Sequence, residues 1–426
     1  MKTPLYCSVR KGLCCAILVL TLILSCSFTT LGSVVERDDG LIISQPDART
    51  TKNHYEYVTM VLKTGYGHEP QDKQGLNSLT NELVYLLLRT SCALEVNYYP
   101  FAEYTVFTFV VWPDDFPLFC AELDGLIRLD TLLLYDLCNE LINLHLHTAE
   151  TLSDQGQSIL YELLYGPDHP YLNNFRPDYT KLSINEVNNW FRAIYKPNNL
   201  IISTTAKLPA DFLKRPTGRE MKQEVLVSAI PPGYTDGPAQ RFLASDAPLS
   251  TVFLAFPAPQ PQEADFFTGR IVQKYLHHQL WLSLRQDLGY CYDLQVNYSY
   301  LNEPTAPTIT IAFQVLPENT EPALDAVFRV LDKLETTKLT PEEIQSYREQ
   351  EEKAQQRNYD VPGFLSLMDA LGVQLDLAWA TDYEQYCANL KLVSADGISS
   401  FAQTYFPKWR LSVVGPVPAG RNKPLP

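Results

Sequence analysis

The sequence predicts an α+β fold built from two homologous halves, each a mainly antiparallel sheet packed with helices. Three observations lead to this class. The 426 residues are too many for one ordinary core and suit two domains of roughly 200 residues. Two segments in different halves of the chain share one pattern. Predicted strands and helices mix within each half without strict alternation.

The shared pattern begins at Ser183, as SINEVNNWFRAIYKPNNLIIS, and at Ser394, as SADGISSFAQTYFPKWRLSVVG. Each segment has a helix cap, an amphipathic helix, Tyr-Xaa-Pro and a strand, and Tyr195 and Tyr405 are 210 residues apart. A period of this length indicates duplicated domains and not a solenoid.

In the first half, leucines at helical spacing follow the turn-rich segment TGYGHEPQDKQ and predict a helix from residue 76. Ser183 and Glu186 predict a capping box at a later helix. The expected strands are 55–63, 103–112 and 199–206, and the expected helices are 76–89, 117–128, 131–150, 155–165 and 184–195.

In the second half, Thr340-Pro341-Glu342-Glu343 supplies an N-cap, a proline at the first helical position and a capping glutamate. The expected strands are 250–256, 291–300, 307–316 and 411–415, and the expected helices are 263–286, 320–336, 341–357, 362–375 and 394–405.

The predicted domain order is a signal peptide over 1–32, an N-terminal domain over 33–213, a linker over 214–240 and a C-terminal domain over 241–420. The linker is rich in Pro, Gly and charge.

The first 32 residues have the form of a secretory signal, with three basic residues before an apolar run from Leu13 to Leu24. A retained membrane anchor is the alternative, but the run is short for a span. The segment ILSC also resembles a bacterial lipoprotein signal with Cys26 as the lipid-bearing residue, although Leu24 is atypical there. The sequence therefore predicts export, to the periplasm, with lipid anchoring as an open alternative.

Charge and cysteine content limit the function classes. Removing residues 1–32 takes away three positive charges and moves the formal net charge from −15 to −18, which disfavours nucleic acid and permits cationic peptides. Five cysteines follow the leader, an odd and widely spaced set that indicates free thiols and not a disulfide framework or zinc knuckle.

Taken in order, the segments GYGHEPQDKQGLNSLTNEL, YGPDHPY, WFRAIYKPNNLII, LRQDLGYCY and LSVVGP resemble the insulinase or pitrilysin-type zinc peptidases. Active members carry the inverted zinc motif His-Xaa-Xaa-Glu-His on the helix after a Gly-Leu step. Two histidines one turn apart hold the metal, and the glutamate takes a proton from metal-bound water.

Aligned on Gly75-Leu76, the motif positions are Ser78, Asn81 and Glu82. A lone carboxylate does not hold zinc, and an amide does not accept the proton. The resemblance therefore implies a degenerate zinc site with no metal in this chain. Histidines close in sequence offer no replacement, because His145 and His147 point to opposite sides of a predicted helix and His277 and His278 diverge.

The segment LRQDLGYCY resembles a family segment whose arginine and tyrosine match Arg285 and Tyr292. In the family this pair reaches from the half without zinc toward the substrate, where a guanidinium and a phenol can donate to the peptide carbonyl and the oxyanion. Alternatively, Arg285 ends a helix and Tyr292 packs at a strand. Gln286 departs from the family's usual glutamate.

Three functions follow from these residues. The chain is expected to be the non-zinc subunit of a heterodimeric, exported zinc peptidase, inactive alone, with zinc in its partner and peptides as substrates. It could instead be a pseudo-enzyme that binds peptides or acts as a scaffold. An active metallopeptidase with an unconventional site is the third alternative.

Overall fold

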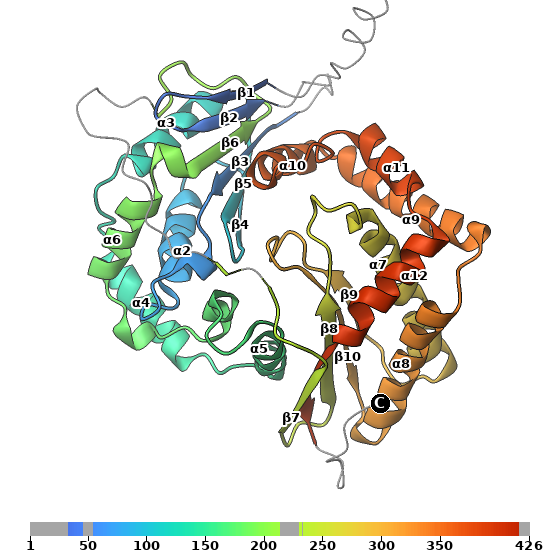
Figure 1. The fold of residues 1–426 in the computed structure, drawn as a ribbon. Helices are drawn as coiled ribbons and strands as arrows, with labels where there is room; N and C mark the ends of the chain where they lie inside the picture. The colour runs from blue at the N-terminus through green and yellow to red at the C-terminus, as the bar shows by residue number, and fades with distance from the viewer. Residues whose placement is uncertain (1–32, 46–53, 214–229, 232, 417–426) are drawn as a thin grey trace, which may run out of the picture.

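The structure is a computed structural model that describes residues 33–45, 54–213, 230–231 and 233–416 (Figure 1). The predicted class is confirmed: the chain is α+β, with a six-stranded and a five-stranded sheet that are both packed with helices. The predicted signal peptide, Cys26 and most of the predicted linker lie outside the described residues.

The first sheet has the strand order β1-β2-β6-β3-β5-β4, with only the β2–β6 pair parallel. Its central strand β3 alternates residues between two buried faces. Val58, Met60 and Leu62 pack with helices on one face in a core of Leu, Val and Phe side chains. The strands are β1 Ser33–Glu36, β2 Ile42–Gln45, β3 Glu56–Leu62, β4 Glu95–Pro100, β5 Thr105–Val111 and β6 Leu200–Thr204. The helices on that face are α2 Leu76–Leu88, α3 Phe116–Ile127, α4 Tyr135–His147 and α6 Ile184–Ile194 (Figure 1).

The second sheet has the order β7-β11-β8-β10-β9, with only the β7–β11 pair parallel. Strand β8 is buried along its whole length, as its apolar sequence predicts. The strands are β7 Ala239–Ala244, β8 Ser250–Pro257, β9 Leu294–Tyr298, β10 Thr308–Val315 and β11 Arg410–Gly415. The helices of this half are α7 Phe266–Leu280, α8 Thr320–Thr336, α9 Pro341–Tyr359, α11 Tyr383–Lys391 and α12 Ala395–Tyr405.

The two halves exchange one helix each. Helix α5, Leu152–Tyr165, follows α4 in the first half but packs on β8 and β11 of the second sheet. Helix α10, Pro362–Leu375, comes from the second half and packs on β3 and β6 of the first sheet (Figure 1). Each sheet therefore has one face covered by a helix of the other half.

Close contacts fix both exchanged helices. A Cβ at Gly156 of α5 would lie 2.6 Å from the Phe253 ring, so only glycine lets α5 approach β8 this closely. In α10, the Asp369 carboxylate accepts a 2.7 Å hydrogen bond from Ser203 of β6. The Ser366 and Thr59 hydroxyls are 3.0 Å apart.

Some elements differ from the sequence-based expectation. Strands β1, β2, β4 and β7 and helix α11 were not expected, and β7 begins inside the predicted linker. The helix expected over 263–286 is α7 followed by a π-helix, Trp281–Asp287. The capping box at Thr340 is confirmed, whereas the Ser183 hydroxyl bonds to the Glu186 carboxylate and not to the helix backbone.

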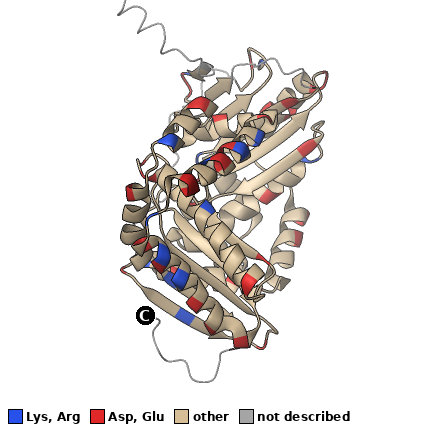
Figure 2. Cartoon of the chain, turned by 90° about the vertical axis from the view of Figure 1, so that its right-hand side faces the viewer, with Lys and Arg blue, Asp and Glu red and all other residues tan. Residues whose placement is uncertain are grey.

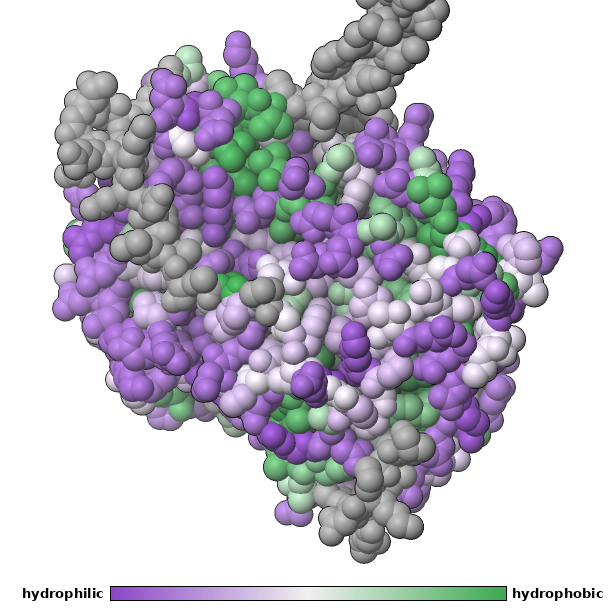
Figure 3. Space-filling model, viewed as in Figure 1, coloured by the Kyte–Doolittle hydropathy of each residue, from purple (hydrophilic) through white to green (hydrophobic). Residues whose placement is uncertain are grey.

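The surface is mixed in charge and hydropathy. Figure 2 shows Asp and Glu residues interspersed with Lys and Arg along the helices of the second half. Figure 3 shows hydrophobic atoms in small separate areas within a mainly hydrophilic face. None of the helices within the described ranges is both long and apolar enough to cross a membrane.

Candidate functional site

Helix α2 carries the three positions that align with the zinc motif, and a buried carboxyl group holds its first turn. Glu69, only 2% exposed, accepts hydrogen bonds from the backbone N–H groups of Gly75 at 2.9 Å and Asn77 at 2.6 Å. Burial raises the pKa of Glu69 to about 8, although these N–H groups act in the opposite direction. The start of α2 is therefore fixed by one side chain from the preceding loop.

Asn81 has a structural environment. Its amide is fully buried, donates to the Asn77 carbonyl at 2.9 Å and accepts from the Tyr195 hydroxyl at 2.6 Å. Trp190 donates to Asn77 at 3.2 Å in the same network. Asn81 thus joins α2 to α6 and to the tyrosine of the repeated Tyr-Xaa-Pro segment.

Glu82 has a partner that sequence reasoning did not identify. Its Oε2 lies 2.7 Å from Nε2 of His145 on α4, and both side chains are roughly one-quarter exposed, at 29% and 27%. The His145 ring stacks on Tyr179, with centroids 4.5 Å apart. No local signal could reveal this pair, because the two residues lie on different helices and 63 positions apart.

These residues do not fit a zinc ion. Glu82 and His145 provide two ligand groups, while the half-buried Ser78 offers only a hydroxyl. Zinc sites in proteins use three or four His, Cys, Asp or Glu ligands. Within the part of the chain that the structure describes, no group of three or more such side chains is arranged to hold a metal ion.

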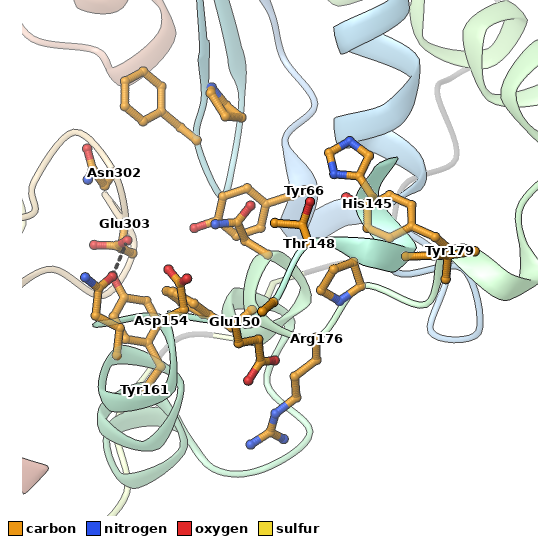
Figure 4. Close-up of a pocket in the computed structure, with 18 residues that line it drawn as sticks. Tyr66, His145, Thr148, Glu150, Asp154, Tyr161, Arg176, Tyr179, Asn302 and Glu303 are labelled. Atoms are coloured by element: carbon orange, nitrogen blue, oxygen red, sulfur yellow. Dashed lines mark hydrogen bonds between the residues drawn. The ribbon is translucent and has the colours of Figure 1, made fainter. Parts of the chain in front are cut away.

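A cavity of about 650 Å³ adjoins this pair and lies between the two halves (Figure 4). His145 and Tyr179 line one side of it, and Asn302 and Glu303 of the second half line the opposite side. Glu150 and Asp154, at and after the link from α4 to α5, contribute two further carboxylates. His145, the partner of Glu82, therefore lines an acidic interdomain cavity.

The second-half wall of the cavity is anchored to the first half. Ala102 N–H donates to the Asn302 carbonyl at 3.3 Å. The Glu103 carboxylate accepts from the Thr305 N–H at 2.8 Å and from its hydroxyl at 2.7 Å. These bonds hold the loop between β9 and β10 against the strand pair β4–β5, so the cavity has two fixed walls.

Arg285 and Tyr292 lie together but outside this cavity. The Arg285 guanidinium lies 4.6 Å from the Tyr292 ring centroid and 5.8 Å from that of Trp281, within cation–π range. Arg285 lies in the last turn of the π-helix, and Tyr292, 83% exposed, precedes β9. The pair is an exposed surface feature at the end of β9 opposite the cavity loop.

The remaining histidines of the resembling loops have local roles. His68 Nδ1 accepts from the Gly65 N–H at 3.0 Å, and His169 Nε2 contacts the Pro231 carbonyl at 3.0 Å. Burial lowers the pKa of both rings. Both histidines therefore bind backbone groups.

Comparison with known proteins supports the resemblance. The family model described as the Peptidase M16 inactive domain matches residues 181–351, which run from α6 into α9. M16 denotes the insulinase and pitrilysin-type peptidases. None of the curated proteins matches the chain in sequence.

Solved structures share the fold over nearly the whole chain. The M16 inactive domain from Pseudomonas fluorescens matches with a TM-score of 0.73 and 13% identity, covering 92% of this chain and 99% of that one. A protease from Helicobacter pylori matches with a TM-score of 0.68 and 13% identity, covering 90% and 99%. The periplasmic protease PqqL from Escherichia coli gives 0.66 and 12%, covering 91% of this chain and 46% of PqqL.

Proposed function

We propose that the chain is the non-zinc subunit of a two-chain exported zinc peptidase, since residues 181–351 match the model of the Peptidase M16 inactive domain. The zinc ion belongs to the partner, and this chain contributes peptide-binding surface. The observation that carries the proposal is an asymmetry: Asn81 and Glu82 are engaged in hydrogen bonds, while Arg285 and Tyr292 stay paired and exposed.

Side chains that contact a substrate bound by another chain must be exposed on the surface of this one. An exposed guanidinium beside a phenol can donate hydrogen bonds to a substrate carbonyl held by another chain. Trp281 and Tyr292 flank Arg285, and clusters of Trp, Tyr and Arg are enriched where protein interfaces concentrate binding energy. The leader over 1–32 motivates export to the periplasm, with Cys26 as an alternative lipid anchor.

The experiment isolates the tagged chain from the exported fraction of its native cells and identifies the co-purified proteins by mass spectrometry. We expect a stoichiometric partner of similar length with an intact zinc motif. In the reconstituted pair, Arg285→Ala and Tyr292→Phe should each lower kcat/KM for a peptide on the order of a hundredfold.

Arg89→Ala is the matched control, because Arg89 is an exposed arginine whose guanidinium also lies over a tyrosine ring, that of Tyr85 at 5.8 Å. It should leave the rate unchanged. Wild-type rates from both test variants would remove the catalytic part of the proposal.

A peptide-binding pseudo-enzyme without a peptidase partner is the second candidate. The interdomain cavity favours it, since an acidic cavity can bind peptides without hydrolysing them. Recovery of the chain alone, together with peptide binding in vitro, would select this candidate.

A further inference from the structure

We propose that the interdomain cavity binds the primary ammonium group of a peptide, with the Glu303 carboxylate as its counter-ion. This inference rests on the peptide-binding function proposed above and names its substrate class. It uses the cavity between α4, α5 and the β9–β10 loop, not the altered zinc motif itself (Figure 4).

The first argument is the charge of the cavity wall. Three carboxylates line it, from Glu150, Asp154 and Glu303, against one permanent cation, Arg176. That guanidinium is already bound, because it lies 2.6 Å from the Glu162 carboxylate and donates to the Pro167 carbonyl at 3.2 Å. The described residues that line the cavity therefore provide no free permanent cation to balance its carboxylates.

The second argument is the state of Glu303, which is only 2% exposed. Its Oε1 accepts a hydrogen bond from the Tyr161 hydroxyl at 2.7 Å. Its Oε2 has no hydrogen-bond partner among the described residues. A buried carboxylate oxygen without a donor is costly, and this oxygen has almost no accessible surface, so it accepts from a ligand when the Glu303 side chain turns toward the cavity that it lines.

Among the described residues, no cation is found to act on Glu303. The groups that act on it are the Ser299 and Tyr161 hydroxyls, which favour its ionised form, and the Glu103 carboxylate, which opposes it. Burial is the largest influence and raises the pKa of Glu303 to about 7. A cationic ligand would favour the ionised form of Glu303, because it would supply the opposite charge that the carboxylate lacks.

The geometry favours an ammonium over a guanidinium. Arg binds carboxylates through two parallel hydrogen bonds, whereas an ammonium is a compact charge that needs one acceptor. Tyr161 donates to one Glu303 oxygen, and the other oxygen is the one without a donor, which a single ammonium N–H can satisfy. Tyr66, Phe101 and Phe175 also line the cavity, and aromatic faces attract ammonium groups.

A primary ammonium can come from a lysine side chain or from a peptide amino terminus. Isothermal titration calorimetry with the full chain at pH 7.5 distinguishes them. The probes are acetyl-Ala-Lys-Ala-amide, Ala-Ala-Ala-amide with a free amino terminus, and acetyl-Ala-norleucine-Ala-amide, which is uncharged. Acetyl-Ala-Arg-Ala-amide is the fourth probe.

We expect the lysine peptide or the free-amino-terminus peptide to bind at least about tenfold more tightly than the norleucine peptide. Glu303→Gln should remove that advantage, and the control Glu318→Gln, at an exposed carboxylate of the short 3₁₀ turn before α8, should keep it. Should Glu303→Gln unfold the chain, Glu150→Gln changes an exposed cavity carboxylate and should weaken binding roughly threefold.

Equal binding of the norleucine and charged peptides would overturn the ammonium assignment but leave the peptide-binding function standing. Equal binding of the arginine and lysine peptides would also overturn it, since a guanidinium would then suit the site as well. Binding of none of the peptides would overturn the inference, while co-purification with a zinc-bearing partner would still uphold the proposed function.

Discussion

At the scale of single residues, two buried carboxyl groups make stability depend on pH. Burial raises the pKa of Glu303 to about 7 and that of Glu69 to about 8, from an ordinary value of 4.5. Across this interval the unfolded chain has released the proton while the folded chain retains it. The free energy of unfolding therefore falls as the pH rises from 4.5 to 8.

We predict that Glu303→Gln reduces this fall, because glutamine does not ionise. The difference in the free energy of unfolding between pH 5 and pH 8 should be smaller in the variant by roughly 3 kcal/mol. Urea unfolding of the wild type and the variant at both pH values measures it, with Glu318→Gln as the control. An unchanged difference would mean that Glu303 is not protonated in the folded protein near neutral pH.

The altered zinc motif gives a second prediction at this scale. Because the described residues at the motif offer two ligand groups, Glu82 and His145, which bond to each other, the purified chain should contain far less than one zinc per molecule. Chelator treatment should leave its melting temperature unchanged. Elemental analysis and thermal unfolding test this, and stoichiometric zinc that survives dialysis would instead support the unconventional metallopeptidase.

The sequence located these motif positions through the helix that carries them, since Leu76, Leu79 and Leu83 recur at helical spacing. It did not reveal the Glu82–His145 contact, which exists only because α4 crosses α2. The unpartnered oxygen of Glu303 was equally hidden, because burial between two halves is a property of tertiary packing.

At the scale of elements, the fit of α5 against β8 gives a matched pair of predictions. Gly156→Ala places a Cβ within 2.6 Å of the Phe253 ring and should lower the free energy of unfolding by roughly 1–3 kcal/mol. Gly125→Ala in α3 meets no atom within 4 Å and should raise it by about 0.5–1 kcal/mol. Chemical denaturation measures both, and equal effects would show that α5 does not pack this tightly on β8.

Regular helices and central strands were predictable from the sequence, whereas the edge strands of the sheets were not. Helix α8, Thr320–Thr336, and helix α10, Pro362–Leu375, coincide with their predicted ranges, because strong apolar periodicity or an initial proline defines them. Strand β4 was missed because it is a short edge strand that ends in Pro100. Strand β7 pairs on one side only, in parallel with β11, so half-exposed residues such as Gln240 carry little apolar signal.

At the scale of the whole molecule, the exchange of α5 and α10 could not be read from the sequence. The repeat indicated two halves, and two separately folding domains would satisfy it equally well. The contacts that decide otherwise join residues far apart, such as Ser203 with Asp369. The cavity depends on the same exchange, since α5 carries Tyr161 and the opposite half carries Glu303.

This exchange predicts that neither half is stable alone. A fragment of residues 33–213 would lose α10, leaving the apolar and hydroxyl-bearing face around Thr59 and Ser203 uncovered. A fragment of residues 230–416 would lose α5 from β8 and β11. We expect each fragment alone to be aggregated or poorly folded, and the two co-expressed fragments to co-purify with native-like circular dichroism and one cooperative unfolding transition. The intact chain cut at a protease site inserted between residues 213 and 230 is the control, and its pieces should stay associated because the exchanged helices hold them together. A monomeric 33–213 fragment that unfolds cooperatively would show that α10 is dispensable for the first sheet.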